Sequence, residues 1–196
     1  MRRIRPFIGN ELIKVMTGIR RAGKSVMLEL IQEELICSGV TPEHFISINF
    51  EDLRYMRLLD AMALHEEILR RAEQIEGKVY LFFDEIQEVT DWEKCINSFR
   101  VSLNCDIYIT GSNAKLLSGE LATYLGGRYV EFVIYPFSFS EFLELYHTMD
   151  PAASVQQCFK SYLLVGGMPY LSNIRYEEEP AKQYLTDLFH SVQLKD

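Results

Sequence analysis

Short apolar runs alternate along the chain with longer stretches in which apolar residues recur every three to four positions. Each run is nearly continuously apolar, as expected for strands that are buried on both faces. The alternation of such strands with helices predicts an α/β fold in which helices flank a parallel sheet. The expected strands are Leu12–Thr17, Phe45–Asn49, Val79–Asp84, Ile107–Thr110 and Tyr129–Ile134.

The helical stretches between these strands include Lys24–Ile36, Leu58–Ile75 and a segment that ends at Phe99. With about 3.6 residues per turn, one side of the first stretch carries Met27, Leu30, Ile31 and Leu35. We expect Asp91 to cap the segment that ends at Phe99, because its carboxylate can accept a free N–H of the first turn.

The pattern changes after Pro136, where strand signals stop. The expected helices beyond that point are residues 138–147, 153–165 and 180–194, and the Gly166-Gly167 pair ends the second of them. We therefore expect a core over residues 1–136 and a helical subdomain over residues 137–196. The last helix runs to the end of the chain without a closing glycine or proline, so we expect this to be a fragment that stops short of a further C-terminal domain.

A phosphate-binding motif lies between the first expected strand and the first expected helix. Residues 18–25, Gly-Ile-Arg-Arg-Ala-Gly-Lys-Ser, fit the pattern G-x-x-x-x-G-K-[ST] in full. The glycines let successive backbone N–H groups surround a phosphate, the Lys24 ammonium reaches the β- and γ-phosphates, and the Ser25 hydroxyl is a ligand for Mg²⁺. The N-terminus of the following helix adds partial positive charge. The motif predicts a nucleoside triphosphate site.

The candidate nucleotide contacts in and just after this loop are Gly18, Arg21, Ala22, Gly23, Lys24, Ser25 and Val26. For Arg20 and Arg21 three orientations are open: toward a phosphate, toward a partner subunit, or into solvent. We favour the last two over the first.

The strand Val79–Asp84 delivers two carboxylates at its C-terminal end, Asp84 and Glu85. We expect Asp84 to hold Mg²⁺ beside Ser25, and Glu85 to orient and deprotonate the attacking water. GTPases carry D-x-x-G at this place, whereas Asp84 is followed by Glu-Ile-Gln. The glutamate beside the magnesium ligand therefore favours ATP hydrolysis over guanine-nucleotide binding.

The strand Ile107–Thr110 runs into small polar residues. A hydroxyl or amide at this point can hold the attacking water, a role called sensor 1, and the candidates are Thr110, Ser112 and Asn113. The sequence does not decide among them; Asn113 is taken as the candidate catalytic residue. A polar turn that caps the next helix is an equally good interpretation of Ser112 or Asn113.

Taken together, these residues resemble a family of prokaryotic AAA+ (and STAND-like) ATPases, over nearly the whole chain. The segments that carry the resemblance are residues 5–8 (Arg-Pro-Phe-Ile), 18–25, 83–88 (Phe-Asp-Glu-Ile-Gln-Glu), 110–113 (Thr-Gly-Ser-Asn), 126–129 (Gly-Gly-Arg-Tyr) and 136–139 (Pro-Phe-Ser-Phe). The resemblance implies a P-loop core of AAA+ type with strand order 5-1-4-3-2, followed by a helical lid. It also implies a C-terminal domain that this chain lacks.

Two further site residues follow from the resemblance. Arg128 is similar to the arginine that AAA+ proteins offer to a γ-phosphate, in cis or from a neighbouring subunit. The alternative is a structural arginine paired with Glu131 or Glu120. Pro169, in Gly-Gly-Met-Pro, resembles the lid proline that packs near the adenine in STAND-type proteins, and a helix stop and turn is a compatible interpretation.

Composition limits the partners and the compartment. The net charge of −8 gives no indication of a nucleic-acid partner. The four cysteines are scattered without a C-x-x-C pair, which argues against a zinc site or a disulfide framework. No apolar run approaches the length of a membrane span, and the N-terminus lacks the apolar stretch of a signal peptide. We expect a cytoplasmic protein.

Three functions compete. The first is an ATPase, slow in this fragment, that couples its nucleotide state to a C-terminal effector domain; the second is a non-hydrolysing ATP-dependent switch or scaffold. The third, a small-molecule phosphotransferase, is disfavoured because residues 138–196 contain only Arg175 where such enzymes need an arginine-rich lid. The expected ligands are ATP and Mg²⁺, and assembly into a homo-oligomer stays open.

Overall fold

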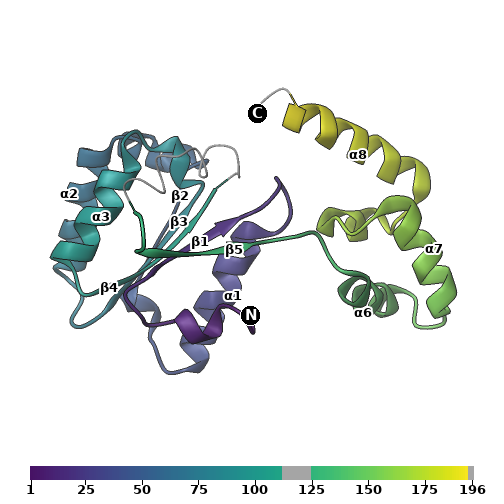
Figure 1. Ribbon diagram of the computed structural model, residues 1–196, viewed down its shortest axis with the longest axis horizontal. Coiled ribbons are helices and arrows are strands. Elements are labelled where there is room, and N and C mark those ends of the chain that lie inside the picture. Colours follow the sequence, from purple (N-terminus) through teal and green to yellow (C-terminus); the bar gives the residue numbers. More distant parts are fainter. Residues whose placement is uncertain (112–124, 194–196) are drawn as a thin grey trace. The chain divides into compact units, whose positions relative to one another are not determined.

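The computed structural model describes residues 1–111 and 125–193. The chain divides into two compact units. One comprises Met1–Gly18 and Lys24–Val133, and the other comprises Ile19–Gly23 and Ile134–Asp196. Figure 1 shows a strand-rich part and a helical part along the chain.

The first unit contains a five-stranded parallel sheet in the order β2-β3-β4-β1-β5. The strands are β1 (Ile13–Thr17), β2 (Phe45–Asn49), β3 (Val79–Asp84), β4 (Cys105–Thr110) and β5 (Tyr129–Val133). The order confirms the expected 5-1-4-3-2 arrangement, and the strand bounds follow the sequence predictions to within two residues. Because the strands are parallel, their carboxyl ends all meet at one edge of the sheet.

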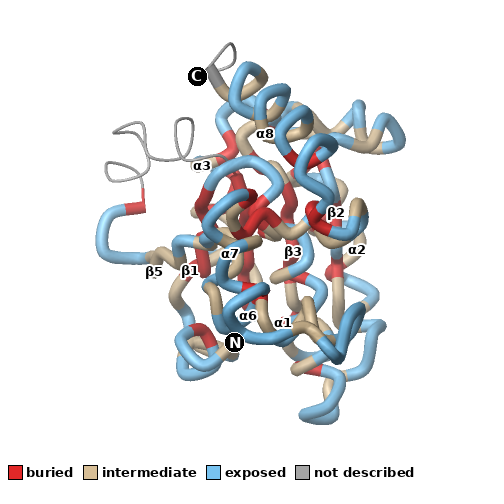
Figure 2. Tube along the Cα trace, turned by 90° about the vertical axis from the view of Figure 1, so that its right-hand side faces the viewer, coloured by how far each residue is buried: buried red, intermediate tan, exposed pale blue. Residues whose placement is uncertain are grey.

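Helices cover both faces of this sheet. Helices α2 (Ala61–Ala72) and α3 (Trp92–Ser102) lie together on one face (Figure 1) and share one core with residues such as Val15, Phe83 and Ile109. Helix α1 (Lys24–Cys37) lies on the other face. Figure 2 shows that buried positions concentrate along the strands. This burial on both faces explains the nearly continuous apolar runs of the central strands.

The buried side of α1 differs from the expected one. It consists of Lys24, Leu28, Ile31 and Leu35, whereas Leu30 is 39% exposed. The apolar residues of α1 itself occur on all sides of the helix. A 3.6-residue period therefore fits more than one face, and it does not identify the face that is buried.

Asp91 precedes α3 as expected, but its side chain does not cap the helix. Its backbone is left-handed, with φ of 57°, whereas a capping residue is typically extended. The adjacent Thr90 N–H donates to Leu59 O, and the Asp91 carboxylate instead pairs with Lys94 at 3.0 Å. The cap predicted for this helix is therefore wrong. The helix expected over Leu58–Ile75 is also shorter, because Leu53–Leu58 forms the 3₁₀ helix η3 and Asp60 caps α2.

The second unit is helical beyond β5. Its elements are α6 (Phe139–Met149), α7 (Val155–Val165), the 3₁₀ helix η5 (Pro169–Ile174) and α8 (Glu178–Gln193). Ser138 and Ser154 form capping boxes with Glu141 and Gln157, which fixes where α6 and α7 begin. The core of this unit is aromatic and centres on Phe142. A Cβ on Gly167 would lie 2.1 Å from Phe137 O, so only glycine fits there.

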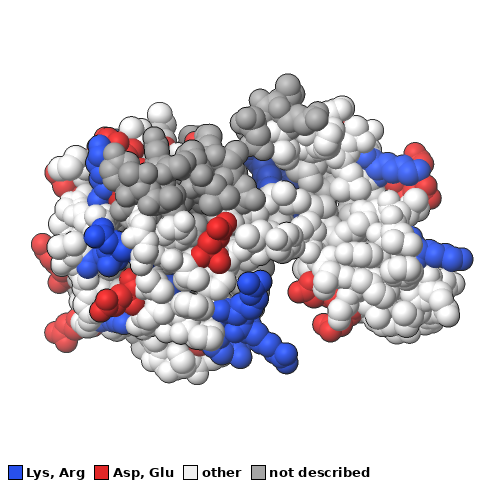
Figure 3. All heavy atoms as spheres, viewed as in Figure 1, with Lys and Arg blue, Asp and Glu red and all other residues white. Residues whose placement is uncertain are grey.

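Figure 3 shows acidic and basic side chains on both units, with one basic group gathered on the first. Within residues 1–111 and 125–193, none of the helices combines the length and the apolar character that crossing a bilayer requires.

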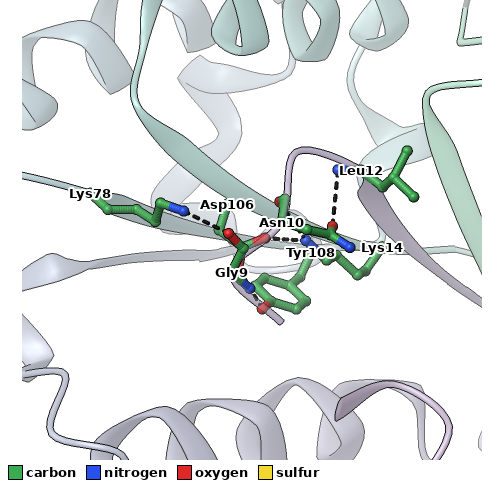
Figure 4. Close-up of polar contacts among 7 residues, drawn as sticks. All are labelled: Gly9, Asn10, Leu12, Lys14, Lys78, Asp106 and Tyr108. Carbon is green, nitrogen blue, oxygen red and sulfur yellow. Dashed lines mark hydrogen bonds and ion pairs between the residues drawn. The ribbon is translucent and has the colours of Figure 1, made fainter. Parts of the chain in front are cut away.

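A polar cluster lies inside the first unit near the amino ends of β1 and β4 (Figure 4). Lys14 and Asp106 are both fully buried, and the Lys14 Nζ lies 2.5 Å from Asp106 Oδ1. The other carboxylate oxygen accepts bonds of 2.7 Å from the Gly9 N–H and from the Tyr108 hydroxyl. Burial lowers the pKa of Lys14, against the attraction of Asp106, and burial raises the pKa of Tyr108. The cluster ties the N-terminal segment to the sheet.

Candidate functional site

The carboxyl edge of the sheet brings together two of the four predicted catalytic residues, Lys24 and Glu85. Strand β3 ends at Asp84, which is in register with Asn49 at the end of β2. The phosphate loop follows β1, a central strand whose five residues are all buried. Polar side chains therefore gather where buried strands end, which is the usual place for a ligand site in an open parallel sheet.

The backbone of the phosphate loop adopts conformations that glycine favours. Gly18 and Gly23 have φ of 140° and 103°, and a Cβ on Gly23 would meet nothing within 4 Å. Arg21 is left-handed as well, with φ of 65°, and its side chain is exposed. Ser25 and Val26 are exposed in the first turn of α1. The loop thus leaves the start of α1 open to solvent, as an anion site at a helix N-terminus requires.

Lys24, the first residue of α1, is a buried charged residue. Only 5% of it is exposed, and its Nζ donates to Gly18 O at 3.2 Å. The same Nζ lies 3.8 Å from Glu85 Oε1. The structure therefore brings together the two residues that were predicted to bind phosphate and to activate water. A buried ammonium is costly unless negative charge lies close to it, and Glu85 supplies that charge here.

Asp84 is held by polar side chains from both neighbouring strands. Its side chain is buried, its Oδ2 accepts a 3.2 Å bond from Asn49 Nδ2, and its Oδ1 accepts a bond from the Thr110 hydroxyl. The Thr110 oxygen in turn accepts a 3.0 Å bond from the Glu85 N–H. Thr110, one of the three sensor candidates, thus fixes both carboxylate residues through one hydroxyl group.

Glu85 occupies an unusual backbone conformation. Its φ and ψ are 55° and 50°, in the left-handed region that non-glycine residues rarely adopt. Strained residues of this kind concentrate at functional sites. The 3₁₀ helix η4 (Ile86–Glu88) follows at once, and Gln87 Nε2 donates to Glu85 Oε2 at 2.5 Å.

The remaining predicted residues make other contacts, belong to the second unit or lie outside the described residues. Arg128 is exposed and donates to Asn97 Oδ1 at 3.0 Å. Glu131, proposed as its acidic partner, instead accepts a 2.6 Å bond from the Thr17 hydroxyl. Pro169 is the first residue of η5 in the second unit. Ser112, Asn113 and Glu120 lie outside the described residues, and the roles of Asn113, Arg128 and Pro169 stay predictions.

Two site residues were missed from the sequence. Asn49 was assigned only as the end of a strand, although a polar residue that closes an apolar run at the carboxyl edge is itself a signal. Gln87 was noted as the residue that replaces the glycine of GTPases and as part of the segment 83–88, and it was given no role of its own. Its contact with Glu85 depends on the left-handed turn at Glu85, which no local pattern indicates.

The double role of Thr110 leads to a stability prediction. Thr110→Val keeps the shape of the side chain but leaves the Asp84 Oδ1 and the Glu85 N–H without this partner. We expect the free energy of unfolding of the first unit to fall by about 1–3 kcal/mol. Urea unfolding followed by the fluorescence of the single tryptophan, Trp92, measures it. A free energy equal to that of the parent chain would show that neither bond matters.

Comparisons with known proteins agree with this geometry. A family model described as an AAA domain matches residues 10–143. An uncharacterized protein of Haemophilus influenzae is 41% identical over 191 residues, which are 97% of this chain and 47% of that protein. The uncharacterized protein MJ1544 of Methanocaldococcus jannaschii is 36% identical, over 91% of this chain and 41% of that protein. The chain thus spans less than half the length of these two relatives.

Two solved structures are similar in fold alone. The Aeropyrum pernix ORC1 protein, solved in complex with DNA, has a TM-score of 0.53 at 14% identity, covering 74% of this chain and 45% of that one. Cdc6p from Pyrobaculum aerophilum has a TM-score of 0.53 at 14% identity, covering 97% of this chain and 59% of that one. The family model matches most of the chain, and the strand order is the one that the resemblance implied. The chain therefore belongs to the AAA domain family of P-loop ATPases.

Proposed function

We propose that this AAA domain binds Mg²⁺-ATP and hydrolyses it. The observation that carries the proposal is the buried Lys24 ammonium, 3.8 Å from the Glu85 carboxylate at the carboxyl edge of the sheet. A lysine at the end of a phosphate loop and a glutamate within reach of it are the groups that phosphate binding and water activation need.

The phosphate loop holds the nucleotide in this proposal. Backbone N–H groups between Gly18 and Ser25 bind the β-phosphate, and the positive φ of Gly18 and Gly23 suits the tight curvature of such a cradle. Lys24 exchanges its contact with Glu85 for the β- and γ-phosphates. Arg21 and Ala22, within the loop, and Val26, just after it, also contact the nucleotide, and Pro169 contacts the adenine.

The residues present also fit a magnesium ion. Hard oxygen ligands are what Mg²⁺ prefers, and the Asp84 carboxylate and the Ser25 hydroxyl supply them. When bound, the ion neutralises charge that develops on the phosphate oxygens. Asn49 and Thr110 keep the Asp84 carboxylate in one orientation.

Hydrolysis uses Glu85 as the base. It takes a proton from the attacking water while Asn113 holds that water as sensor, and Arg128 stabilises the charge on the γ-phosphate. Arg128 is exposed, so it can serve its own site or that of a neighbouring subunit in a homo-oligomer. In the longer proteins of this family we propose that residues 1–136 act as the ATPase core and 137–196 as a lid, which passes the nucleotide state to a C-terminal effector domain.

Nucleotide binding tests the first step. Lys24→Ala removes the charge-assisted bonds to the phosphates, and we expect the Kd for Mg²⁺-ATP to rise about 10- to 100-fold. Titration with a fluorescent ATP analogue measures it, with ADP and GTP as competitors. Lys160→Ala, an exposed lysine of α7, is the matched control and should bind as the parent chain does.

Steady-state release of phosphate is measured on the same preparations. Unchanged affinity in Lys24→Ala would contradict the assigned site. Binding that depends on Lys24 without turnover would favour the alternative, a non-hydrolysing ATP-dependent switch.

A further inference from the structure

The two polar atoms of the Gln87 side-chain amide differ in their hydrogen bonding among the described residues. Its Nε2 donates to Glu85 Oε2 at 2.5 Å. Its Oε1 is buried and has no hydrogen-bond partner among the described residues. A buried acceptor without a donor is energetically unfavourable, so its presence beside a proposed catalytic base calls for a functional reason.

The orientation of this amide follows from chemistry. Exchanging the positions of the amide nitrogen and oxygen would place the oxygen 2.5 Å from a carboxylate oxygen of Glu85, and two acceptors repel at that distance. The nitrogen must therefore face Glu85. Because nitrogen and oxygen share one rigid plane, the oxygen is directed away from the bond that Glu85 accepts.

The backbone holds Gln87 in this place. Glu85 turns the chain through its left-handed conformation, and η4 closes with bonds from Glu88 N to Glu85 O and from Val89 N to Ile86 O. Ile86 is fully buried and Val89 is 2% exposed, so both neighbours anchor the turn in the core. The amide thus belongs to a fixed element rather than to a free loop.

We infer that Gln87 is a further catalytic residue for the proposed hydrolysis, on which this inference rests: its Oε1 accepts a hydrogen bond from the attacking water while its Nε2 holds Glu85. A water molecule has two O–H groups. With one directed at the Glu85 carboxylate and the other at Gln87 Oε1, a lone pair of the water oxygen is free to face the γ-phosphorus. Positioning of the attacking group is, with electrostatic stabilisation, what a protein contributes to phosphoryl transfer.

The step balances without any further reactant. The water oxygen forms a bond to the γ-phosphorus, and the bond from that phosphorus to the β–γ bridging oxygen breaks, with its electron pair leaving on ADP. One water proton passes to the Glu85 carboxylate, and the other stays on the new phosphate. Gln87 neither gains nor loses a proton.

The test substitutes methionine, which has nearly the length of glutamine but neither donates nor accepts strongly. We expect Gln87→Met to lower kcat for ATP about 10- to 100-fold, with KM and the Kd for the ATP analogue within about threefold of the parent chain. Gln74→Met, at an exposed glutamine, is the matched control and should leave kcat unchanged. Gln87→Glu keeps an acceptor but removes the donor to Glu85 and adds a like charge, and it too should lower kcat.

Each other outcome overturns the inference. Normal kcat in Gln87→Met, with turnover still lost in Glu85→Gln, would remove the role of Gln87 and leave the proposed hydrolysis standing. If Gln87→Met instead weakens nucleotide binding and lowers the melting temperature together with kcat, Gln87 only supports the turn. Turnover that is absent from the parent chain, or that persists in Glu85→Gln, would overturn the proposed hydrolysis and this inference together.

Discussion

Replacing Glu85 by glutamine is expected to lower kcat for ATP about 10²- to 10⁴-fold, the range typical for loss of a general base. Glutamine has the same size and can still donate and accept hydrogen bonds, so the water site keeps its shape but loses the group that takes the proton. The Kd for Mg²⁺-ATP should stay the same or fall, because the carboxylate that lies 3.8 Å from Lys24 in this structure no longer competes with the phosphates for it. Steady-state phosphate release and titration with a fluorescent analogue measure the two quantities.

Glu144→Gln, at an exposed glutamate of α6, is the matched control. It makes the same chemical change away from the proposed site and should turn over ATP as the parent chain does. If both variants hydrolyse ATP equally, Glu85 is not the base. If Glu85→Gln instead loses affinity together with kcat, the carboxylate contributes to binding rather than to the chemical step.

The sheet could be predicted from the sequence because burial on both faces leaves a distinct pattern. β3 and β4, each buried over almost its whole length, were predicted to within two residues. β2 alternates between buried and exposed positions, as an edge strand does, and bulky residues at Phe45, Ile46 and Ile48 still marked it. The order of the strands in the sheet leaves no such local pattern, and its prediction came from the resemblance to a family.

Helix details were predicted less well, for reasons of tertiary packing. The apolar residues of α1 occur all around the helix, and only contact with the sheet selects Leu28 over Leu30. The cap at Asp91 failed because a backbone bond between Thr90 and Leu59 fixes the chain just before the helix. A sequence pattern cannot show a contact between residues that distant along the chain.

The candidate site was predictable as far as its motifs extend. Lys24 and Glu85 were assigned from separate segments, and the structure places them 3.8 Å apart. The residues that orient these groups were not assigned such roles, because asparagine, threonine and glutamine are common in turns and at strand ends. Only three-dimensional proximity distinguishes Asn49 and Gln87 from ordinary polar residues.

The buried pair Lys14–Asp106 leads to the largest expected effect on stability. Asp106→Ala leaves the Lys14 ammonium inside the sheet without its counter-ion, and it also removes the acceptor for the Gly9 N–H and the Tyr108 hydroxyl (Figure 4). Breaking a buried pair from one side typically costs about 3–5 kcal/mol. We expect a loss of that size in the free energy of unfolding of the first unit. Urea unfolding followed by Trp92 fluorescence reports on that unit, since Trp92 lies in its core.

A double substitution separates the cost of an orphaned charge from the strength of the pair. In Lys14→Met/Asp106→Asn neither charge remains, and the asparagine oxygen can still accept from Gly9 or Tyr108. The double variant should therefore be more stable than Asp106→Ala, and its loss should be smaller than the sum of the losses in the single variants Lys14→Met and Asp106→Asn. Glu34→Ala, which breaks the exposed pair with Arg5, should cost far less, because water solvates the arginine that it leaves behind. Additive losses across the cycle would mean that Lys14 and Asp106 contribute separately to stability. The cluster that connects the N-terminal segment to the sheet would then consist of independent hydrogen bonds and not of one ion pair.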